Sequence, residues 1–285
     1  MKVAEIMTSP VVCIRPAEPV AHARNLMLKH KIKHLVVLGE GQLAGIVSMK
    51  DLAEALSAES SPLRRRPIDD IPTEQIMHGK LITAAPGTDV AKAADMLIKH
   101  GISSLVITEG RELAGILTKT DLTRFFAERL EGQTKVRDLM STKVITANRG
   151  HSLSHLVELM GQNNIGRVVI VSGERPIGIV TTADIAFAQL ELPSTGVAQR
   201  RVSFTRKLER AGRPKCRYVK YVALLTAEDV MRTELLTVPA DEDAARAAKL
   251  MLEHKISGLP VVEEEKLVGI LTKTDLAKSV AKLGE

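Results

Sequence analysis

The chain of 285 residues carries one pattern four times. In each copy a methionine is followed 44 positions later by an aspartate, and the pairs are Met7 and Asp51, Met77 and Asp121, Met140 and Asp184, and Met231 and Asp275. The residues around each aspartate also agree, reading GIVSMKDL, GILTKTDL, GIVTTADI and GILTKTDL. A spacing kept in four copies indicates a repeated structural unit of roughly 55 residues, and this repeat restricts the fold more than any other feature.

Each copy reads as one small mixed unit, which the first copy illustrates. Residues 11–14 form a short β-rich run, and residues 20–30 place Val20, Ala23 and Met27 on one helical face. Residues 35–38 and 43–47 are apolar strands on either side of a turn, and residues 49–57 form a closing helix. The predicted fold is α+β, with the order β-α-β-β-α and helices on one face of a small sheet. Such a unit buries too little surface to be stable alone, so we expect it to pair with a neighbour.

The distances between copies predict which of them pair. From each aspartate to the next methionine the separations are 26, 19 and 47 positions. The last separation contains an extra segment, and the first reads as a solvated linker. We therefore expect copies 1 and 2 to form one module and copies 3 and 4 another. The expected boundaries are 1–57, 71–128, 134–190 and 228–285 for the copies and 191–227 for a basic insertion between copies 3 and 4.

The complete pattern resembles the cystathionine-β-synthase-type regulatory domain, called the CBS domain. The shared features are the methionine, a first strand ending near Thr-x-x-Pro, a helix, an apolar strand pair and the motif G-h-h-[ST]-x-x-D. The resemblance implies that two copies pack through their sheets into a pseudo-twofold Bateman module with two clefts. In that family the clefts commonly bind adenosine-containing ligands such as AMP, ADP, ATP or S-adenosylmethionine. This chain would then hold two modules and up to four clefts.

The resemblance assigns ribose binding to the four aspartates and a supporting hydroxyl to the residue three positions earlier, which is Ser48, Thr118, Thr181 or Thr272. A carboxylate can accept hydrogen bonds from both ribose hydroxyls, and a helix N-terminus offers amide donors to a phosphate. The same Ser/Thr-x-x-Asp spacing is close to a capping box, which any helix start can use. Both roles remain open at this point, and one aspartate can perform both.

Two further positions of the motif carry predicted cleft residues. Six residues after each methionine the family lines the cleft with a hydroxyl, and the residues here are Cys13, Thr83, Thr146 and Thr237. A thiol is a poor hydrogen-bond partner, so the cleft that uses Cys13 should bind weakly or not at all. Twenty-seven residues after each methionine stand His34, Ser104, Arg167 and Gly258. In relatives such as the γ subunit of AMP-activated kinase, basic residues here meet phosphates, which makes His34 and Arg167 candidates; the alternative is a solvated residue at a strand entrance.

The segment 191–227 holds nine basic and two acidic residues, whereas the rest of the chain has 31 basic and 32 acidic residues. It also contains Phe204, Tyr218 and Tyr221, half of the aromatic residues of the chain. Basic and aromatic side chains interleaved in this way suit RNA or a single strand, and the ribosome is an abundant candidate. The predicted contacts are Arg200, Arg201, Arg206, Lys207, Arg210, Arg213, Lys215, Arg217, Tyr218, Lys220 and Tyr221. The alternative is a solvated basic loop in which residues 218–222 add an edge strand.

Other motifs exclude several classes of protein. His151, His155 and Glu158 could share one helix face, but without another histidine or a cysteine nearby we do not expect a zinc site. The two cysteines, Cys13 and Cys216, lie far apart and read as free thiols of a reducing compartment, and no apolar run is long enough for a membrane span. We therefore expect a cytoplasmic protein. Because no phosphate-binding glycine loop and no nucleophile elbow occur, we expect no enzyme and no required cofactor.

The sequence as a whole predicts a regulatory protein that senses adenine nucleotides, AMP, ADP or ATP, in its CBS clefts. Its basic insertion is the predicted docking site for RNA or the ribosome. The alternative is a regulatory subunit that controls a metabolic enzyme or transporter through protein contacts. The sequence does not decide the oligomeric state, and a homodimer is one option.

Overall fold

The computed structural model of the protein describes residues 1–57, 68–185, 202–206, 217–221 and 225–284. Repeat 1 contains β1 (Cys13–Ile14), α1 (Val20–His30), β2 (His34–Gly39), β3 (Gln42–Ser48) and α2 (Met49–Ser57). Strand β1 runs parallel to β2, and β2 is antiparallel to β3. Helix α1 begins after Pro19, buries Val20, Ala23 and Met27 as expected from their spacing, and ends at His30, before Lys31, whose φ is 55°.

The other repeats follow the same order. Repeat 2 has β4 (Thr83–Ala84), α3 (Val90–Lys99), β5 (Ser104–Glu109), β6 (Glu112–Thr118) and α4 (Lys119–Arg129). Repeat 3 has β7 (Thr146–Ala147), α6 (Leu153–Gln162), β8 (Arg167–Ser172) and β9 (Arg175–Thr181). Repeat 4 has β12 (Val238–Pro239), α9 (Ala244–Glu253), β13 (Gly258–Glu263), β14 (Lys266–Thr272) and α10 (Lys273–Ala281). A short helical turn also precedes each methionine of the pattern: η1 (Val3–Glu5), η4 (Thr73–Gln75), α5 (Val136–Leu139) and α8 (Ala227–Val230).

The repeats pair by exchanging the segments that carry these methionines. Thr8, which follows Met7, forms two backbone hydrogen bonds of 2.9 and 3.0 Å with Ile116 in β6 of repeat 2. In return, His78 of repeat 2 pairs with Ile46 in β3 of repeat 1. Repeats 3 and 4 make the same exchange, through Ser141 with Ile270 and Arg232 with Ile179. The predicted grouping into modules 1–2 and 3–4 is thereby confirmed.

The exchange explains two conserved features of the internal repeat, the methionine and the glycine of the G-h-h-[ST] motif. A Cβ built on Gly45 would lie 2.8 Å from the carbonyl oxygen of His78 and 2.9 Å from the sulfur of Met77. The other exchanged methionines meet Gly115, Gly178 and Gly269 in the same way. The glycine therefore leaves room for the partner's methionine, because a side chain there would overlap the crossing segment.

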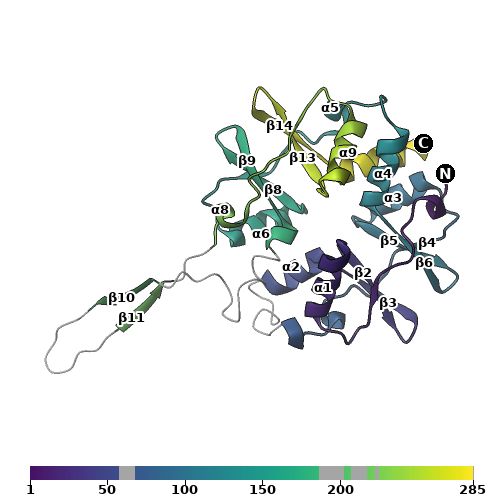
Figure 1. Cartoon of the computed structure of the whole chain (residues 1–285), viewed down its shortest axis with the longest axis horizontal. Helices are drawn as coiled ribbons and strands as arrows, with labels where there is room; N and C mark the ends of the chain where they lie inside the picture. The colour runs from purple at the N-terminus through teal and green to yellow at the C-terminus, as the bar shows by residue number, and fades with distance from the viewer. Residues whose placement is uncertain (58–67, 186–201, 207–216, 222–224, 285) are drawn as a thin grey trace.

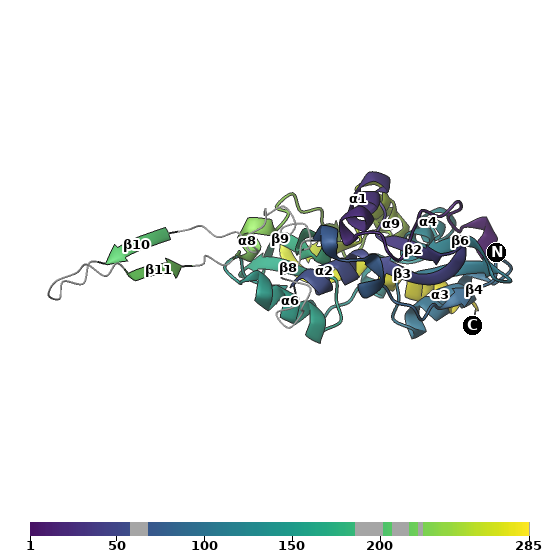
Figure 2. The same cartoon turned by 90° about the horizontal axis from the view of Figure 1, so that it is seen from below.

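The two modules join through repeats 2 and 4. Helices α3 and α4 pack against α9 and α10, and a shared core that includes Leu97, Phe126, Met251 and Val280 lies between them (Figure 1). Seen from the perpendicular direction the four repeats form one flattened body (Figure 2). Repeats 1 and 3 instead have separate cores. The modules are thus joined by a continuous apolar core on one side of the molecule.

Strands β10 (Val202–Arg206) and β11 (Arg217–Tyr221) of the basic insertion form an antiparallel pair in whose backbone register Phe204 is opposite Val219. Residues 218–221 of the alternative edge strand lie in β11, which pairs with β10 in a two-stranded sheet, and residue 222 lies outside the described residues. In the described part of the chain, no helix combines the length and the apolar character that a membrane span requires.

Candidate functional site

Each aspartate of the repeat lies in the first turn of the closing helix and caps it. Asp121 Oδ2 accepts hydrogen bonds from the backbone N–H of Thr118 at 2.8 Å and from its hydroxyl at 2.7 Å. Asp51, Asp184 and Asp275 make the same two bonds with Ser48, Thr181 and Thr272. The capping role is therefore present in all four copies, and it occupies one carboxylate oxygen and leaves the other directed elsewhere.

The second oxygen, Oδ1, meets the partner repeat. Its neighbour is always the residue directly after the exchanged methionine, because backbone pairing at that residue places its side chain beside the partner's closing helix. Thr8 donates to Asp121 Oδ1 at 3.3 Å, and Ser141 donates to Asp275 Oδ1 at 3.4 Å. Arg232 Nε donates to Asp184 Oδ1 at 2.9 Å, and His78 Nε2 lies 2.9 Å from Asp51 Oδ1. Each cleft between paired repeats thus contains a carboxylate from one repeat and a polar side chain from the other.

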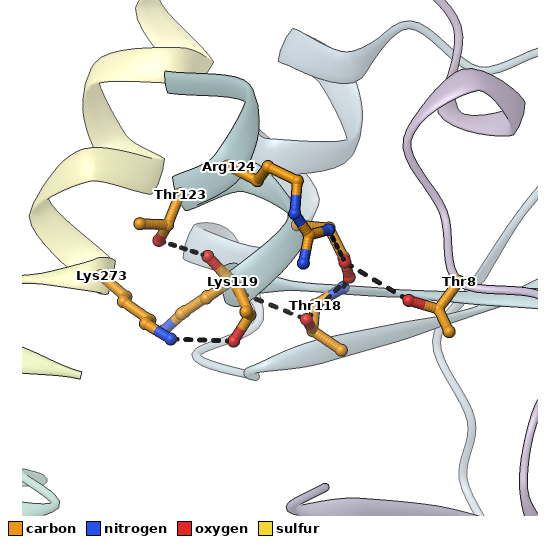
Figure 3. Close-up of polar contacts among 8 residues, drawn as sticks. Thr8, Thr118, Lys119, Thr123, Arg124 and Lys273 are labelled. Carbon is orange, nitrogen blue, oxygen red and sulfur yellow. Dashed lines mark hydrogen bonds and ion pairs between the residues drawn. The ribbon is translucent and has the colours of Figure 1, made fainter. Parts of the chain in front are cut away.

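The clefts are of two kinds, which we call hydroxyl clefts (Asp121 and Asp275) and basic clefts (Asp51 and Asp184). Figure 3 shows the polar contacts of a hydroxyl cleft, in which Thr8, Thr118 and Arg124 donate to the carboxylate of Asp121. Arg124, one turn further along α4, forms an ion pair of 3.3 Å with Asp121. Lys278 lies 3.6 Å from Asp275 in the equivalent place. Sequence reasoning missed the residues after the methionines, since no local motif links them to an aspartate in another copy.

The residues predicted to supply a hydroxyl lie at or next to the first strands. Thr83 and Thr146 begin β4 and β7 and are exposed, and the exposed Thr237 lies one residue before β12. Cys13 begins β1, and its thiol donates to the carbonyl of Val11 at 3.5 Å. Burial raises the pKa of the Cys13 thiol, which keeps it protonated. The proposed contacts of these four residues with a ligand stay predictions.

His34 and Arg167, the predicted phosphate contacts, each cross to the partner repeat. His34 Nε2 lies 2.6 Å from Ser103 Oγ. Arg167 donates to the carbonyl oxygen of Ser257 and, at 3.0 Å, to its hydroxyl. Gly258, which occupies the position equivalent to Arg167, has no side chain and so leaves space for the guanidinium. Ser104, at the same position of repeat 2, is buried.

Basic residues from all four repeats lie close enough to influence one another electrostatically; they are Lys33, His34, Lys119, Arg167 and Lys273. We call this group the central cation cluster. Burial lowers the pKa of His34 to about 4, although Asp51 acts in the opposite direction, so His34 is neutral at pH 7. Burial and then Lys33 and Arg167 lower the pKa of Lys273 to about 8. Burial also lowers the pKa of Arg167 to about 10, which leaves it charged.

The two lysines of the cluster in repeats 2 and 4 join the modules reciprocally. Lys119 Nζ donates to Thr274 Oγ1 at 3.0 Å. In return, Lys273 Nζ donates to Thr120 Oγ1 at 3.1 Å (Figure 3). The predicted site did not include these lysines. A signal was present, however, because copies 2 and 4 share the identical octapeptide GILTKTDL while copies 1 and 3 differ.

A cavity of about 270 Å³ opens between repeat 1 and module 3–4. Thr181, Ala183 and Arg232 of the Asp184 cleft line it, together with Arg167 from the central cation cluster. Lys33 and Leu28 approach it from repeat 1 of the other module. The volume lies just below the range of ligand pockets, which starts at roughly 300 Å³. The cavity combines apolar walls with several basic side chains and the carboxylate of Glu234.

The histidines do not gather into a metal site in the described residues. His30 ends α1, and His100 and His254 follow the last residues of α3 and α9, so this repeat position lies at the end of the first helix. The rings of His151 and His155 meet edge to face with centroids 4.6 Å apart. Within the described ranges no three histidine, cysteine or acidic side chains come together in a way that could hold a metal ion.

The predicted RNA contacts fall in and around the hairpin. Arg206 lies in β10, and Arg217, Tyr218, Lys220 and Tyr221 lie in β11. The remaining predicted contacts, Arg200, Arg201, Lys207, Arg210, Arg213 and Lys215, lie outside the described residues, as does Cys216. The RNA contact stays a prediction.

A family model of the CBS domain matches residues 3–58, 73–128, 136–191 and 227–282. The chain belongs to the CBS domain family. We therefore call its repeats CBS1 to CBS4, and the two modules are Bateman modules, as the resemblance implied.

Similar proteins include MJ1404 of Methanocaldococcus jannaschii, which is 30% identical over 289 residues. That match covers 99% of this chain, and this chain spans 62% of the length of MJ1404. The crystal structure of MJ1225 from the same organism, described as a proposed archaeal homologue of g-AMPK, has a TM-score of 0.78 at 20% identity and covers 98% of this chain and 99% of its own. The two chains share a fold. The CBS domain pair of protein MJ0100, with 27% identity, a TM-score of 0.40 and coverage of 45% of this chain and 98% of its own, was crystallised with 5′-methylthioadenosine and S-adenosyl-L-methionine.

Proposed function

We propose that the protein is a regulatory CBS protein that binds AMP, ADP or ATP in its clefts and catalyses no reaction. The observation that carries this proposal is the arrangement of the four aspartates. Each holds one carboxylate oxygen in the helix cap and directs the other toward the partner repeat, where a ribose hydroxyl could take the place of the present donor. Asp121 illustrates the setting, because it is 3% exposed and lies in the first turn of α4.

The central cation cluster supports a ligand that carries phosphate as well as ribose. Mutual repulsion between Lys33, Arg167 and Lys273 contributes to the lowered pKa of Lys273. A phosphate placed among these side chains would remove part of that repulsion and offer a charged acceptor to the arginine fork. Ribose recognition by the aspartates and phosphate recognition by the cluster together favour a nucleotide over a nucleoside.

Arg167→Ala should weaken AMP binding far more than adenosine binding, because only AMP carries the phosphate. Isothermal titration of the whole chain with both ligands measures the two affinities. Arg167→Lys is the matched control: it keeps a charge but loses the planar fork, so it should retain part of the AMP affinity. Since Arg167 also donates to Ser257, thermal unfolding of each variant should be recorded beside the titrations. An equal loss for AMP and adenosine would refute the phosphate role.

The regulatory output would follow from a change in the arrangement of the two modules. A ligand can shift such an equilibrium only if it binds one arrangement more tightly than the other. The cavity beside Asp184 allows such a difference in affinity, because residues of both modules line it. A ligand there would touch Lys33 of CBS1 and Arg167 of CBS3 together, and so would favour the arrangement that holds the two repeats close.

We further propose that the basic insertion presents this output to RNA, with the ribosome as the candidate partner. Its excess of basic residues over acidic ones supports an anionic partner. A pull-down from native lysate, with and without AMP or ATP, should recover ribosomal RNA in a salt-sensitive way and should lose it when Arg200, Arg201, Arg206 and Lys207 are neutralised. Recovery of one stoichiometric protein that resists nuclease would instead identify a regulatory subunit of an enzyme or transporter.

A further inference from the structure

The two clefts of the second Bateman module hold their aspartates with different partners. In the Asp184 cleft, Arg232 donates through Nε at 2.9 Å, and its Nη2 lies 2.8 Å from the same Oδ1. In the Asp275 cleft, the equivalent residue is Ser141, whose hydroxyl lies 3.4 Å from Oδ1. The helix caps are matched, because each aspartate caps its helix through a threonine with bonds of 2.6 and 2.9 Å. Asp275 Oδ1 also lies 3.6 Å from Lys278 Nζ, so the partner-repeat contact, a guanidinium at Asp184 and a hydroxyl at Asp275, is the difference that the substitutions below test.

A ribose that binds either aspartate must take over Oδ1, because Oδ2 serves the cap. Ser141 donates one long hydrogen bond from an uncharged hydroxyl, so a ribose hydroxyl can replace it with a bond of the same kind. Arg232 instead forms an ion pair as well as a hydrogen bond with a carboxylate whose side chain is 9% exposed. A neutral ligand that displaces Arg232 leaves two charges without their partner.

A phosphorylated ligand can compensate for this loss. The Arg232 side chain is 58% exposed and lines the cavity, so it has room to turn away from Asp184. A phosphate in the same cavity would give the guanidinium a new anionic partner and would also meet Arg167 and Lys33. The new ion pair between Arg232 and the phosphate would then offset the free energy lost when the Arg232–Asp184 ion pair opens.

We propose that Arg232 makes the Asp184 cleft selective for phosphorylated ligands, whereas the Asp275 cleft accepts nucleosides and nucleotides alike. Arg232 is the specificity-determining residue in this reading, and Ser141 is its permissive counterpart. The inference rests on the proposed function, because it assumes that the ribose binds at the aspartates. It adds that the two clefts of one module differ in ligand class.

The test is isothermal titration of the full chain with adenosine and with AMP. Arg232→Ser should create one additional adenosine site, or raise adenosine affinity at that cleft by roughly tenfold, while AMP gains less or loses affinity. The reciprocal variant Ser141→Arg should remove one adenosine site and leave AMP binding largely intact. Arg232→Lys keeps a cation beside Asp184 and should behave like the wild-type protein.

Three outcomes distinguish the role of Arg232 from the proposed function. A change of the adenosine-to-AMP affinity ratio in opposite directions in the two reciprocal variants supports the role of Arg232. If AMP binds and the adenosine-to-AMP affinity ratio is the same in wild type, Arg232→Ser and Ser141→Arg, the role of Arg232 is overturned and the proposed function stands. Absence of binding by either ligand in wild type and in all variants overturns both.

Discussion

Raising the pH from 7 to 9 should weaken AMP binding by about tenfold, or ~1.4 kcal/mol, through a single lysine. Lys273 has a pKa of about 8 instead of 10.5, because burial and the cations Lys33 and Arg167 disfavour its charge. Asp121 acts in the opposite direction, and Arg124 adds a further small decrease. A phosphate among these groups would favour the charged ammonium and return its pKa toward the ordinary value.

The tenfold loss of AMP affinity follows from the protonation of Lys273 in the protein without ligand. At pH 7 Lys273 is mostly charged, and at pH 9 only about a tenth of the molecules carry its proton, so AMP must bind together with proton uptake. The phosphate of AMP is mostly dianionic throughout this range, because its second pKa is about 6. It therefore adds little to the pH dependence of AMP binding. Stability of the empty protein changes in the opposite direction. It rises between pH 8 and 10.5, because the unfolded chain keeps a proton that the folded chain has lost.

The assay is isothermal titration of AMP between pH 7 and 9 in buffers of different ionisation enthalpy, which reports affinity and proton uptake together. Lys273→Arg is the matched control, because arginine stays charged throughout this range and should give a flatter profile. Lys33 and Lys119 also have lowered pKa values from burial, so the difference between the two proteins, rather than the wild-type slope alone, measures Lys273. Identical pH profiles for wild type and Lys273→Arg would refute the reasoning.

Two further predictions concern the pairing of repeats and modules. Gly45→Ala should destabilise the protein by about 1–3 kcal/mol in urea unfolding, because its Cβ would overlap the His78 carbonyl, whereas Gly161→Ala, with open space around it, should be neutral or stabilising. Equal effects of the two substitutions would contradict the role assigned to the crossing segment. Phe126→Ala, which empties a fully buried site in the core shared by CBS2 and CBS4, should cost about 3–5 kcal/mol, and the half-buried Phe125→Ala should cost less. A loss below 1 kcal/mol for Phe126→Ala, about the cost of an exposed substitution, would count against a rigid junction between the modules.

Much of the fold could be predicted because its signals are local. Helical and strand periodicities lie within each copy, and they placed α1 at residues 20–30 and α2 at 49–57 as the structure has them. The linker composition of the first separation and the extra segment in the last led to the two modules that the structure has, although the shortest separation, 19 positions, joins copies 2 and 3 of different modules. The Ser/Thr-x-x-Asp spacing likewise predicted the helix caps, which depend on residues only three positions apart.

What completes each cleft was decided by tertiary structure. One contact of each aspartate's Oδ1 comes from another copy, for example Arg232 to Asp184 across 48 positions, and no periodicity connects such residues. The central cation cluster likewise assembles Lys33, Arg167 and Lys273 from three repeats, and burial there lowers the pKa of His34 until it is neutral. Sequence by itself thus determined the repeated unit, its helix caps and the pairing of the copies into modules. Only the packed structure decided which charges meet, because electrostatic interactions depend on distance and burial, which the crossing segments and the module junction create.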